Sequence, residues 1–494
     1  MFKKILIANR GEIAVRVIRT CRDMGLATVA LVSQNDQGAL HVRLADECYP
    51  ILSEKRFGDG QEVLAIAQAC GADAIHPGYG FLAEDADFAA ACAGAGIAFI
   101  GPPPGVIQTL RRKADCLEAV EAAGFATPPH SASFVGASDP DLLAAAAADL
   151  GYPLVVKSCR GGRGRGSRIV DRPERLAEAV AQAQRESTSV YGSDQIYFEK
   201  AIAPSHHVEV QILADAFGNI VHLGERDGSL QRNNQKMIVE SPAPYLRPDQ
   251  REEIIQAALT ITRLLNYVGV GTVEFLVDGQ GRHFFTEMKA RIQVEHPVNE
   301  MRSGVDLVAE QIRIAAGEPL GFTQADIRLS GWAMQCRVNA EDPWNNFLPS
   351  PGLLERFRIP GGPGVRVDSS GYVGYCMPVR YDSLLSKVVA WGEDRPLALG
   401  RLRRALQDFK IVGVQTNIPL HLHILADERY AQGHYTTNFM RRAKFRDAGD
   451  LGDRAEDLAA AAAVAFVLRN QAGRPVVSEH TQSGWHRSSR RLPS

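Results

Sequence analysis

The first regular unit of the chain has the sequence KKILIANRGEIA, residues 3–14. Apolar residues up to Ala8 predict a strand, and Asn9, Arg10 and Gly11 predict a tight turn. Apolar residues at helical spacing then predict a helix, and residues 27–32 predict a second strand. This order of strand, tight turn, helix and strand is typical of a βαβ unit in a parallel sheet.

The same alternation continues to about residue 104. Short apolar runs at residues 71–75 and 97–100 predict further strands, and helical patterns occupy residues 60–70 and 85–95. The alternation of strands and helices predicts a parallel, doubly wound sheet. The sequence GPPP, residues 101–104, marks its end.

Two further regions follow. A strand at residues 154–157 leads into a loop of glycines and arginines at 160–166, then a helix near 174–186 and a strand at 196–200. Beyond His207, alternating residues at 208–213, 272–277 and 283–288 predict an antiparallel sheet with one solvated face. More strand-like segments lie within residues 332–389, and a helix is expected over 397–409.

Composition limits the possible functions. The 494 residues suffice for about three domains at roughly 150 residues each. A formal net charge of -2 gives no general attraction for nucleic acid or an anionic membrane, so neither is expected as a partner. No apolar run reaches the ~20 residues of a membrane span. The eight cysteines form no Cys-x-x-Cys pair, which favours a cytoplasmic protein with free thiols.

The loop after Lys157 is a candidate phosphate site. Glycines let backbone N–H groups approach an anion, and interleaved arginines neutralise it. The loop matches neither the P-loop nor the Rossmann fingerprint, so a plain surface loop remains an equal alternative at this point.

Two carboxylates on predicted strands are candidate metal ligands. Glu274 and Glu287 each have apolar neighbours, so both side chains would project from the sheet into a cleft. Mg²⁺ prefers oxygen ligands and bridges phosphates. For either residue alone, a solvent-facing glutamate is the simpler interpretation.

The segment EMKARIQVEHP, residues 287–297, carries the strongest signal. If it is one strand, residues 287, 289, 291, 293 and 295 share a face. Five polar groups on one face are costly to bury, which indicates a functional surface. Lys236 and Arg337 are weaker candidates, because each taken singly fits a surface cation. His76 alone fits a capping or core histidine.

Together these residues resemble the biotin carboxylase component of acetyl-CoA carboxylase, within the ATP-grasp superfamily. The motifs that carry the resemblance occur in family order over residues 1 to about 445. They are IANRGEIA (7–14), HPGYGFL (76–82), Arg226-Asp227, RIQVEHP (291–297), RVNAEDP (337–343), FLPSP (347–351) and Tyr381-Asp382-Ser383.

The resemblance implies a mixed α/β and α+β fold of the biotin carboxylase type. Its parts would be an N-terminal doubly wound, pre-ATP-grasp domain, an ATP-grasp lid, and a catalytic antiparallel sheet domain. The expected boundaries are 1–113, 114–203 and 204–445. Residues 446–494 would then form an Ala-rich helix and a basic tail that we expect to be disordered.

The implied activity is that of a ligase: ATP and bicarbonate carboxylate biotin through carboxyphosphate, with Mg²⁺ or Mn²⁺ as cofactor. Glu295 would be the base, Arg337 would steady biotin, and Glu274 and Glu287 would bind metal. Bicarbonate would contact Lys236, Arg291, Gln293 and Val294, of which Lys236 and Arg291 are also counted as catalytic. The implied nucleotide contacts are Lys113, Lys157, Arg163, Gly164, Glu199, Lys200, Ile202, His207, Gln231, Asn234 and Leu276.

Four departures from the family pattern accompany the resemblance. Lys289 replaces an asparagine metal ligand, so it either stands in for one of two metals or lowers metal affinity. Arg160 and Arg163 interrupt a loop that is nearly all glycine in the family. The remaining departures are Asn234 in place of a histidine and Gly228 in place of a cysteine.

The implied partners are a biotin carboxyl carrier protein, carboxyltransferase subunits and a second copy of the chain in a homodimer. The acyl acceptor, in fatty acid biosynthesis or elsewhere, is left open. Two alternatives also remain: a degenerate homologue that acts as a nucleotide-binding or scaffold subunit of a carboxylase, and another ATP-grasp ligase. Retention of the predicted catalytic residues favours the active biotin carboxylase.

Overall fold

The fold is seen in a computed structural model that describes residues 1–134, 139–159, 167–378, 380–443, 445 and 461–466. The chain divides into two units, Met1–Lys444 and Phe445–Ser494, which are described separately. In the second unit, residues 461–466 are helical, inside the predicted Ala-rich helix. The predicted disordered tail and the loop with Arg160, Arg163 and Gly164 lie outside the described residues.

The first part of the chain forms the predicted parallel sheet, with strand order β3-β2-β1-β4-β5. The strands are β1 (Lys4–Ile7), β2 (Ala27–Val32), β3 (Glu47–Pro50), β4 (Ala74–His76) and β5 (Ala98–Phe99). The helices are α1 (Gly11–Asp23), α2 (Leu40–Leu44), α3 (Gly60–Cys70), α4 (Ala86–Gly94) and α5 (Pro104–Arg111).

Alternation along β1 explains why this sheet is covered on both sides. Ile5 and Ile7 pack into one apolar cluster with α1, whereas Leu6 packs into a second cluster with α3 and α4. The turn after β1 is held by Asn9, whose amide donates to the carbonyls of Pro77 and Tyr79 at 2.7 and 2.9 Å. The loop after β4 is therefore anchored beside the first turn of the chain.

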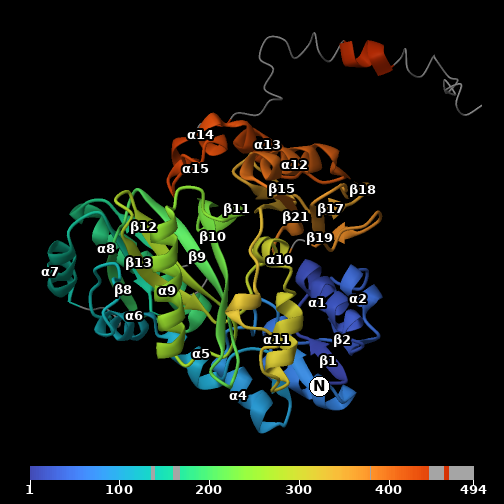
Figure 1. The fold of residues 1–494 in the computed structure, drawn as a ribbon, viewed down its shortest axis with the longest axis horizontal. Coiled ribbons are helices and arrows are strands. Elements are labelled where there is room, and N and C mark those ends of the chain that lie inside the picture. The colour runs from blue at the N-terminus through green and yellow to red at the C-terminus, as the bar shows by residue number, and fades with distance from the viewer. Residues whose placement is uncertain (135–138, 160–166, 379, 444, 446–460, 467–494) are drawn as a thin grey trace, which may run out of the picture. The chain divides into compact units, whose positions relative to one another are not determined.

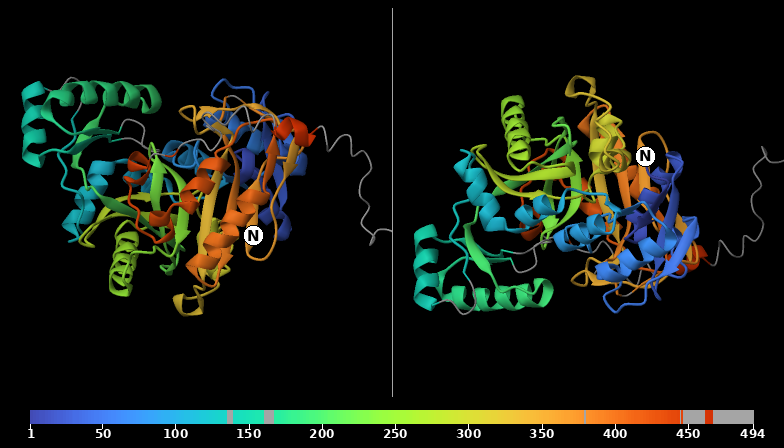
Figure 2. Two further views of the ribbon diagram at one scale, coloured as in Figure 1. Left: turned by 90° about the horizontal axis from the view of Figure 1, so that it is seen from above. Right: turned by 90° about the horizontal axis from the view of Figure 1, so that it is seen from below.

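A separate small layer follows, in which β6, β7 and β8 form an antiparallel sheet of order β7-β6-β8. Its strands are β6 (Leu154–Ser158), β7 (Arg168–Val170) and β8 (Ile196–Lys200), and its helices are α7 (Pro140–Leu150) and α8 (Leu176–Tyr191). These helices pack on the sheet through their own apolar cluster. Figure 2 shows this layer at one side of the molecule, apart from the blue N-terminal sheet.

An eight-stranded antiparallel sheet forms the centre of the first unit, with order β13-β12-β9-β10-β11-β14-β21-β19. Its strands are β9 (Ser205–Ala214), β10 (Ile220–Arg232), β11 (Gln235–Ser241), β12 (Gly269–Asp278), β13 (His283–Lys289), β14 (Trp332–Asn339), β19 (Val365–Ser369) and β21 (Leu384–Gly392). The predicted strands at 208–213, 272–277 and 283–288 are thereby confirmed, but the predicted solvated face is wrong for β9 and β12, because residues 208–214 and 269–275 are buried on both faces.

Helices cover this sheet as its apolar residues require. The long helix α9 (Pro248–Leu264) lies in front of β9 and β12 (Figure 1) and shares their core with α6 (Lys113–Ala122). Val298 of α10 (Pro297–Ser303) packs on Val239 of β11 and Val389 of β21. The remaining helices are α11 (Leu307–Ala315), α12 (Arg395–Asp408), α13 (Ile418–Ala426), α14 (Glu428–Ala431) and α15 (Phe439–Arg442).

Short elements complete the first unit. The remaining short strands are β15 (Glu341–Asp342), β16 (Leu348–Pro349), β17 (Gly352–Leu353), β18 (Arg356–Arg358), β20 (Cys376–Met377) and β22 (Lys410–Val412). Single 3₁₀ turns occur at Arg56–Gly58, Pro173–Arg175 and Gln324–Asp326. The predicted boundaries at residues 113, 203 and 445 stay predictions.

One prediction about the segment 287–297 is wrong. Strand β13 ends at Lys289, so residues 291, 293 and 295 do not continue a strand face. The chain turns instead, because Pro297 begins α10 and the N–H groups of His296 and Val298 donate back to the carbonyls of Gln293 and Glu295. The polar side chains of this segment are gathered by a turn.

The predictions of no membrane span and of free thiols can be compared with the structure. No helix in the described part of the chain combines the length and apolar character needed to cross a membrane. All eight cysteines are free, as predicted, and six of them are buried.

Candidate active site

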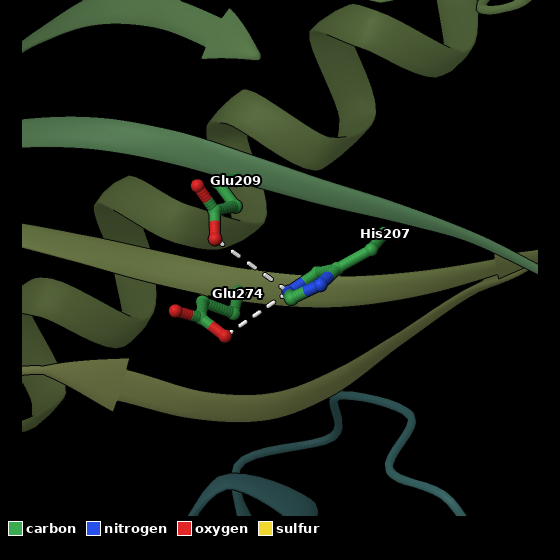
Figure 3. Close-up of side chains that lie close together, drawn as sticks. All are labelled: His207, Glu209 and Glu274. Atoms are coloured by element: carbon green, nitrogen blue, oxygen red, sulfur yellow. Dashed lines mark hydrogen bonds and ion pairs between the residues drawn. The ribbon is translucent and has the colours of Figure 1, made fainter. Parts of the chain in front are cut away.

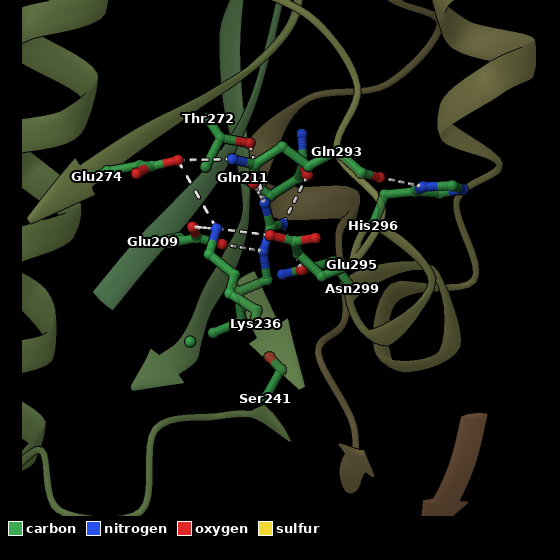
Figure 4. Close-up of polar contacts among 12 residues, drawn as sticks. Glu209, Gln211, Lys236, Ser241, Thr272, Glu274, Gln293, Glu295, His296 and Asn299 are labelled. Atoms are coloured by element: carbon green, nitrogen blue, oxygen red, sulfur yellow. Dashed lines mark hydrogen bonds and ion pairs between the residues drawn. The ribbon is translucent and has the colours of Figure 1, made fainter. Parts of the chain in front are cut away.

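The candidate active site lies where the large sheet meets the turn after β13. Strands β9, β11 and β12 point polar side chains toward this turn (Figure 4), and the arginines of β10 and β14 reach it by hydrogen bonds. The residues that meet here are Glu209, Arg226, Lys236, Glu274, Gln293, Glu295 and Arg337.

Lys236 is the central cation of this group. Its ammonium donates to Glu295 Oε1 at 2.5 Å and contacts Glu209 Oε1, and it lies 3.8 Å from Glu274 Oε1. Lys236 is 9% exposed and Glu295 is 1% exposed. Because solvent screens these charges so little, the lysine and its three carboxylates form one electrostatic unit.

Glu295 is held between two cations. Besides Lys236, the guanidinium of Arg337 donates to Glu295 Oε2 at 2.7 Å. Burial by itself would raise the pKa of Glu295, but the charges of Lys236 and Arg337 outweigh it and hold that pKa far below its usual value. The carboxylate is therefore ionised and available to accept a proton.

Arg226 is fully buried and donates hydrogen bonds to several members of the cluster. Its Nε donates to Glu209 Oε2 at 2.7 Å, and its two terminal nitrogens reach four further side chains. Those partners are Gln211 and Asn299 at 2.8 and 2.9 Å, Thr272 at 3.0 Å, and Gln293. A planar guanidinium with five donors can satisfy all of these acceptors at once.

Glu274 and Glu287 face each other as register partners of β12 and β13, so their side chains share one face. Gln293 Nε2 donates to Glu274 Oε1 at 2.6 Å, and His207 Nε2 lies 3.0 Å from Oε2 (Figure 3). Since the Gln231 amide donates to His207 Nδ1 at 2.8 Å, the proton is assigned to Nε2, which donates to Glu274.

Glu287 forms ion pairs with two lysines. The ammoniums of Lys113 and Lys289 lie 3.0 and 2.8 Å from its Oε2. Burial would raise the pKa of Glu287, but Lys113 and Lys289 together lower it to about 2. Lys289, in turn, has a raised pKa, because the carboxylates of Glu287 and Glu274 outweigh its burial.

The donor set decides which of these carboxylates fit a metal. His207, Glu209 and Glu274 bring ligand atoms within 4.8 Å of one another. His207 Nε2 carries the assigned proton and Glu209 is paired with Lys236 and Arg226, so only Glu274 of these three is left as a candidate metal ligand. Glu274 and Glu287 fit one Mg²⁺ or Mn²⁺, because Mg²⁺ is bound by one or two carboxylates together with substrate phosphates.

Comparisons with known proteins agree with this geometry. The chain matches the family models "Biotin carboxylase, N-terminal domain" over residues 1–107, "Carbamoyl-phosphate synthase L chain, ATP binding domain" over 113–323, and "Biotin carboxylase C-terminal domain" over 335–442. It is 47% identical to the biotin carboxylase of a Nostoc species over 443 residues, which cover 89% of this chain and 99% of that protein. The chain belongs to the biotin carboxylase family.

Other members of the family are similar over the same span. Biotin carboxylase 1 of Bacillus subtilis is 44% identical over 89% of this chain and 98% of that protein. One of the pyruvate carboxylase subunits of Methanothermobacter thermautotrophicus is also 44% identical, over 89% of this chain and 90% of that protein.

A solved relative shares the fold over most of the chain. The biotin carboxylase domain dimer of Hydrogenobacter thermophilus 2-oxoglutarate carboxylase, in complex with MgADP, ADP and bicarbonate, superposes with a TM-score of 0.87. It is 43% identical, and the match covers 89% of this chain and 97% of that one. The predicted family, fold class and biotin carboxylase function are confirmed by these relatives, and its ligands agree with the predicted ATP and Mg²⁺.

The predicted nucleotide residues of this biotin carboxylase are only partly gathered. Lys157 on β6 lies 2.5 Å from Glu199 Oε2 on β8, and Tyr197 donates to the other oxygen of Glu199 at 2.6 Å. Lys200 instead donates to the carbonyl of Tyr152 at 3.0 Å. The other predicted nucleotide positions are Ile202 in the loop after β8 and Leu276 on β12. Val294, predicted to contact bicarbonate, is half-buried in the turn after β13.

Asn234 lies away from the buried group, at the exposed turn between β10 and β11. Both residues of this turn, Asn233 and Asn234, have positive φ values of 48° and 61°. Asparagine adopts this left-handed conformation more readily than most residues. The departure from histidine at this position therefore suits the hairpin turn.

The sequence motifs did not identify three polar residues that the structure places in the site: Glu84, Glu209 and Gln211. Glu84, in the loop after β4, lies 3.5 Å from Arg291 Nε and holds that arginine from the N-terminal sheet. Glu209 and Gln211 alternate with valines and isoleucine on β9, so a row of polar residues in an apolar strand was their available signal. His76 is fully buried at the end of β4 and accepts from the N–H of Gly78 at 3.0 Å, so it is the core histidine of the two structural interpretations.

Proposed function

We propose that this protein carboxylates biotin with bicarbonate and ATP, through carboxyphosphate, in the first half-reaction of a biotin-dependent carboxylase. The observation that carries the proposal is the buried Glu295, held between Lys236 and Arg337 beside the Glu274–Glu287 pair. A carboxylate base next to two cations suits a reaction in which a bound anion must lose a proton.

The residues take the following roles in this proposal. Lys236, Arg291, Gln293 and Val294 bind bicarbonate, Glu295 deprotonates it, and Arg337 steadies the ureido group of biotin. The nucleotide contacts are Lys113, Lys157, Arg163, Gly164, Glu199, Lys200, Ile202, His207, Gln231, Asn234 and Leu276. Glu274 and Glu287 hold the metal ion, which neutralises charge on the phosphates when it is bound.

The ion pairs of Glu295 couple its basicity to the substrates. When bicarbonate engages Lys236 and biotin engages Arg337, the two cations that lower the pKa of Glu295 most are shared with the substrates, and only the smaller effect of Arg226 is unchanged. Its pKa then rises toward the ordinary value, which strengthens it as a base. The base is thus most effective when both substrates are present.

Partners and location complete the proposal. Relatives of similar identity are subunits or domains of pyruvate and 2-oxoglutarate carboxylases, so the family works in multi-subunit enzymes and includes dimers. For this chain we propose a biotin carboxyl carrier protein, carboxyltransferase subunits and a second copy as partners. The free thiols support a cytoplasmic location.

Release of ADP tests this function. With Mg-ATP and bicarbonate, free biotin is expected to stimulate ADP release, and Arg337→Ala is expected to lower the biotin-dependent part by roughly 10²-fold. Arg282→Ala, which removes an arginine that is exposed in its pair with Asp278, is the matched control and keeps the full rate. Release that ignores biotin and bicarbonate, or responds to amino acids instead, contradicts the proposal.

A further inference from the structure

Lys289 is the last residue of β13 and points into the proposed nucleotide site. Its ammonium lies 2.8 Å from Glu287 Oε2 and the side chain is largely buried. Lys113, at the start of α6, reaches the same oxygen at 3.0 Å from the opposite element. One oxygen of a proposed metal ligand is therefore shared by two protein ammoniums.

The second proposed ligand is also engaged by protein donors. Gln293 donates to one oxygen of Glu274 at 2.6 Å, and His207 donates to the other at 3.0 Å. Mg²⁺ binds carboxylate oxygens at about 2.0–2.1 Å and keeps near-octahedral geometry. Two such ions on this pair would place four positive charges against oxygens that four side chains already contact.

Coulomb repulsion limits the number of ions further. A divalent ion bound to Glu287 would lie only a few ångströms from the Lys289 ammonium, inside a site that excludes most solvent. A single ion meets this repulsion once, and the nucleotide phosphates would offset it with negative charge, whereas a second ion would be repelled by both the ammonium and the first ion. The ammonium then remains as a second, permanent cation.

We propose that Lys289 is a built-in cation that takes the place of one divalent ion, so that the nucleotide binds with a single metal. This inference rests on the nucleotide site proposed above. The ammonium has three N–H donors, so it can hold Glu287 and still donate to a phosphate oxygen. Lys289 thereby acts as a positioning residue for the triphosphate and sets the metal count of the site.

Manganese binding tests this count without relying on turnover. The full chain is titrated with Mn²⁺ in the presence of saturating β,γ-methylene-ATP, and free Mn²⁺ is followed by electron paramagnetic resonance. We expect one tightly bound Mn²⁺ per chain for the natural protein. Lys289→Asn removes the charge and adds a neutral amide oxygen, so it is expected to bind two.

A second variant separates charge from ligand. Lys289→Met removes the ammonium without offering an oxygen, and we expect it to keep one Mn²⁺ while binding the analogue about tenfold more weakly by isothermal titration calorimetry. Two tight Mn²⁺ ions in the natural protein, or unchanged analogue affinity in Lys289→Met, would overturn the inference. Failure of the natural chain to bind the analogue at all would instead overturn the proposed function on which the inference rests.

Discussion

Glu295→Gln is expected to lower bicarbonate-dependent ADP release by roughly 10²- to 10⁴-fold, the usual contribution of a positioned general base. The substitution keeps the size of the side chain but removes the proton acceptor between Lys236 and Arg337. The measurement is the initial rate at saturating Mg-ATP with and without bicarbonate. Affinity for β,γ-methylene-ATP should stay within about threefold, because Glu295 contacts Lys236 and Arg337, neither of which is a proposed nucleotide residue.

Glu310→Gln is the matched control for this variant. Glu310 lies on α11, is 6% exposed and pairs with Arg313. Like Glu295, it is therefore a buried glutamate with a cationic partner, but it lies outside the proposed site. We expect its rate to equal that of the natural protein. A Glu295→Gln enzyme that retained more than about a tenth of the bicarbonate-dependent rate would exclude Glu295 as the base.

Arg226→Met is expected to cause the largest loss of stability, about 3–5 kcal/mol in the free energy of unfolding, as is usual when one partner of a buried ion pair is removed. The side chain has no exposed surface, and its loss leaves the buried Gln211 and Thr272 without the arginine donor and Glu209 with Lys236 alone. Urea unfolding followed by tryptophan fluorescence measures the change.

The same variant should also affect bicarbonate. Arg226 contacts Gln293, so a folded Arg226→Met or Arg226→Lys protein is expected to show a higher KM for bicarbonate with a nearly unchanged KM for ATP. Arg429→Met serves as control, because that arginine is half exposed in its pair with Asp427 and should cost at most about 1 kcal/mol. A stability loss for Arg226→Met no greater than that of the control would contradict the role of the buried guanidinium.

Local patterns predicted much of the fold. The strand, turn and helix of residues 3–21 appear as β1 and α1, and the predicted strand at 27–32 is β2. Such elements can be predicted because apolar spacing of period 2 or 3.6 is set by neighbouring residues. The polar row beginning at Glu287 shows the limit of prediction from local patterns. Its alternation suggested one continuous strand, yet β13 ends at Lys289 and the chain turns before α10 begins at Pro297.

The sequence by itself determined the family, the order of strands and helices, and the residue types of the site, because motifs and periodicity are properties of adjacent residues. Only the tertiary structure decided which charges meet. Glu209, Lys236, Glu295 and Arg337 come from β9, β11, a turn and β14, and the strand order β9-β10-β11-β14 brings them together. Contacts between residues so far apart in the chain depend on sheet register and burial, which no local pattern encodes.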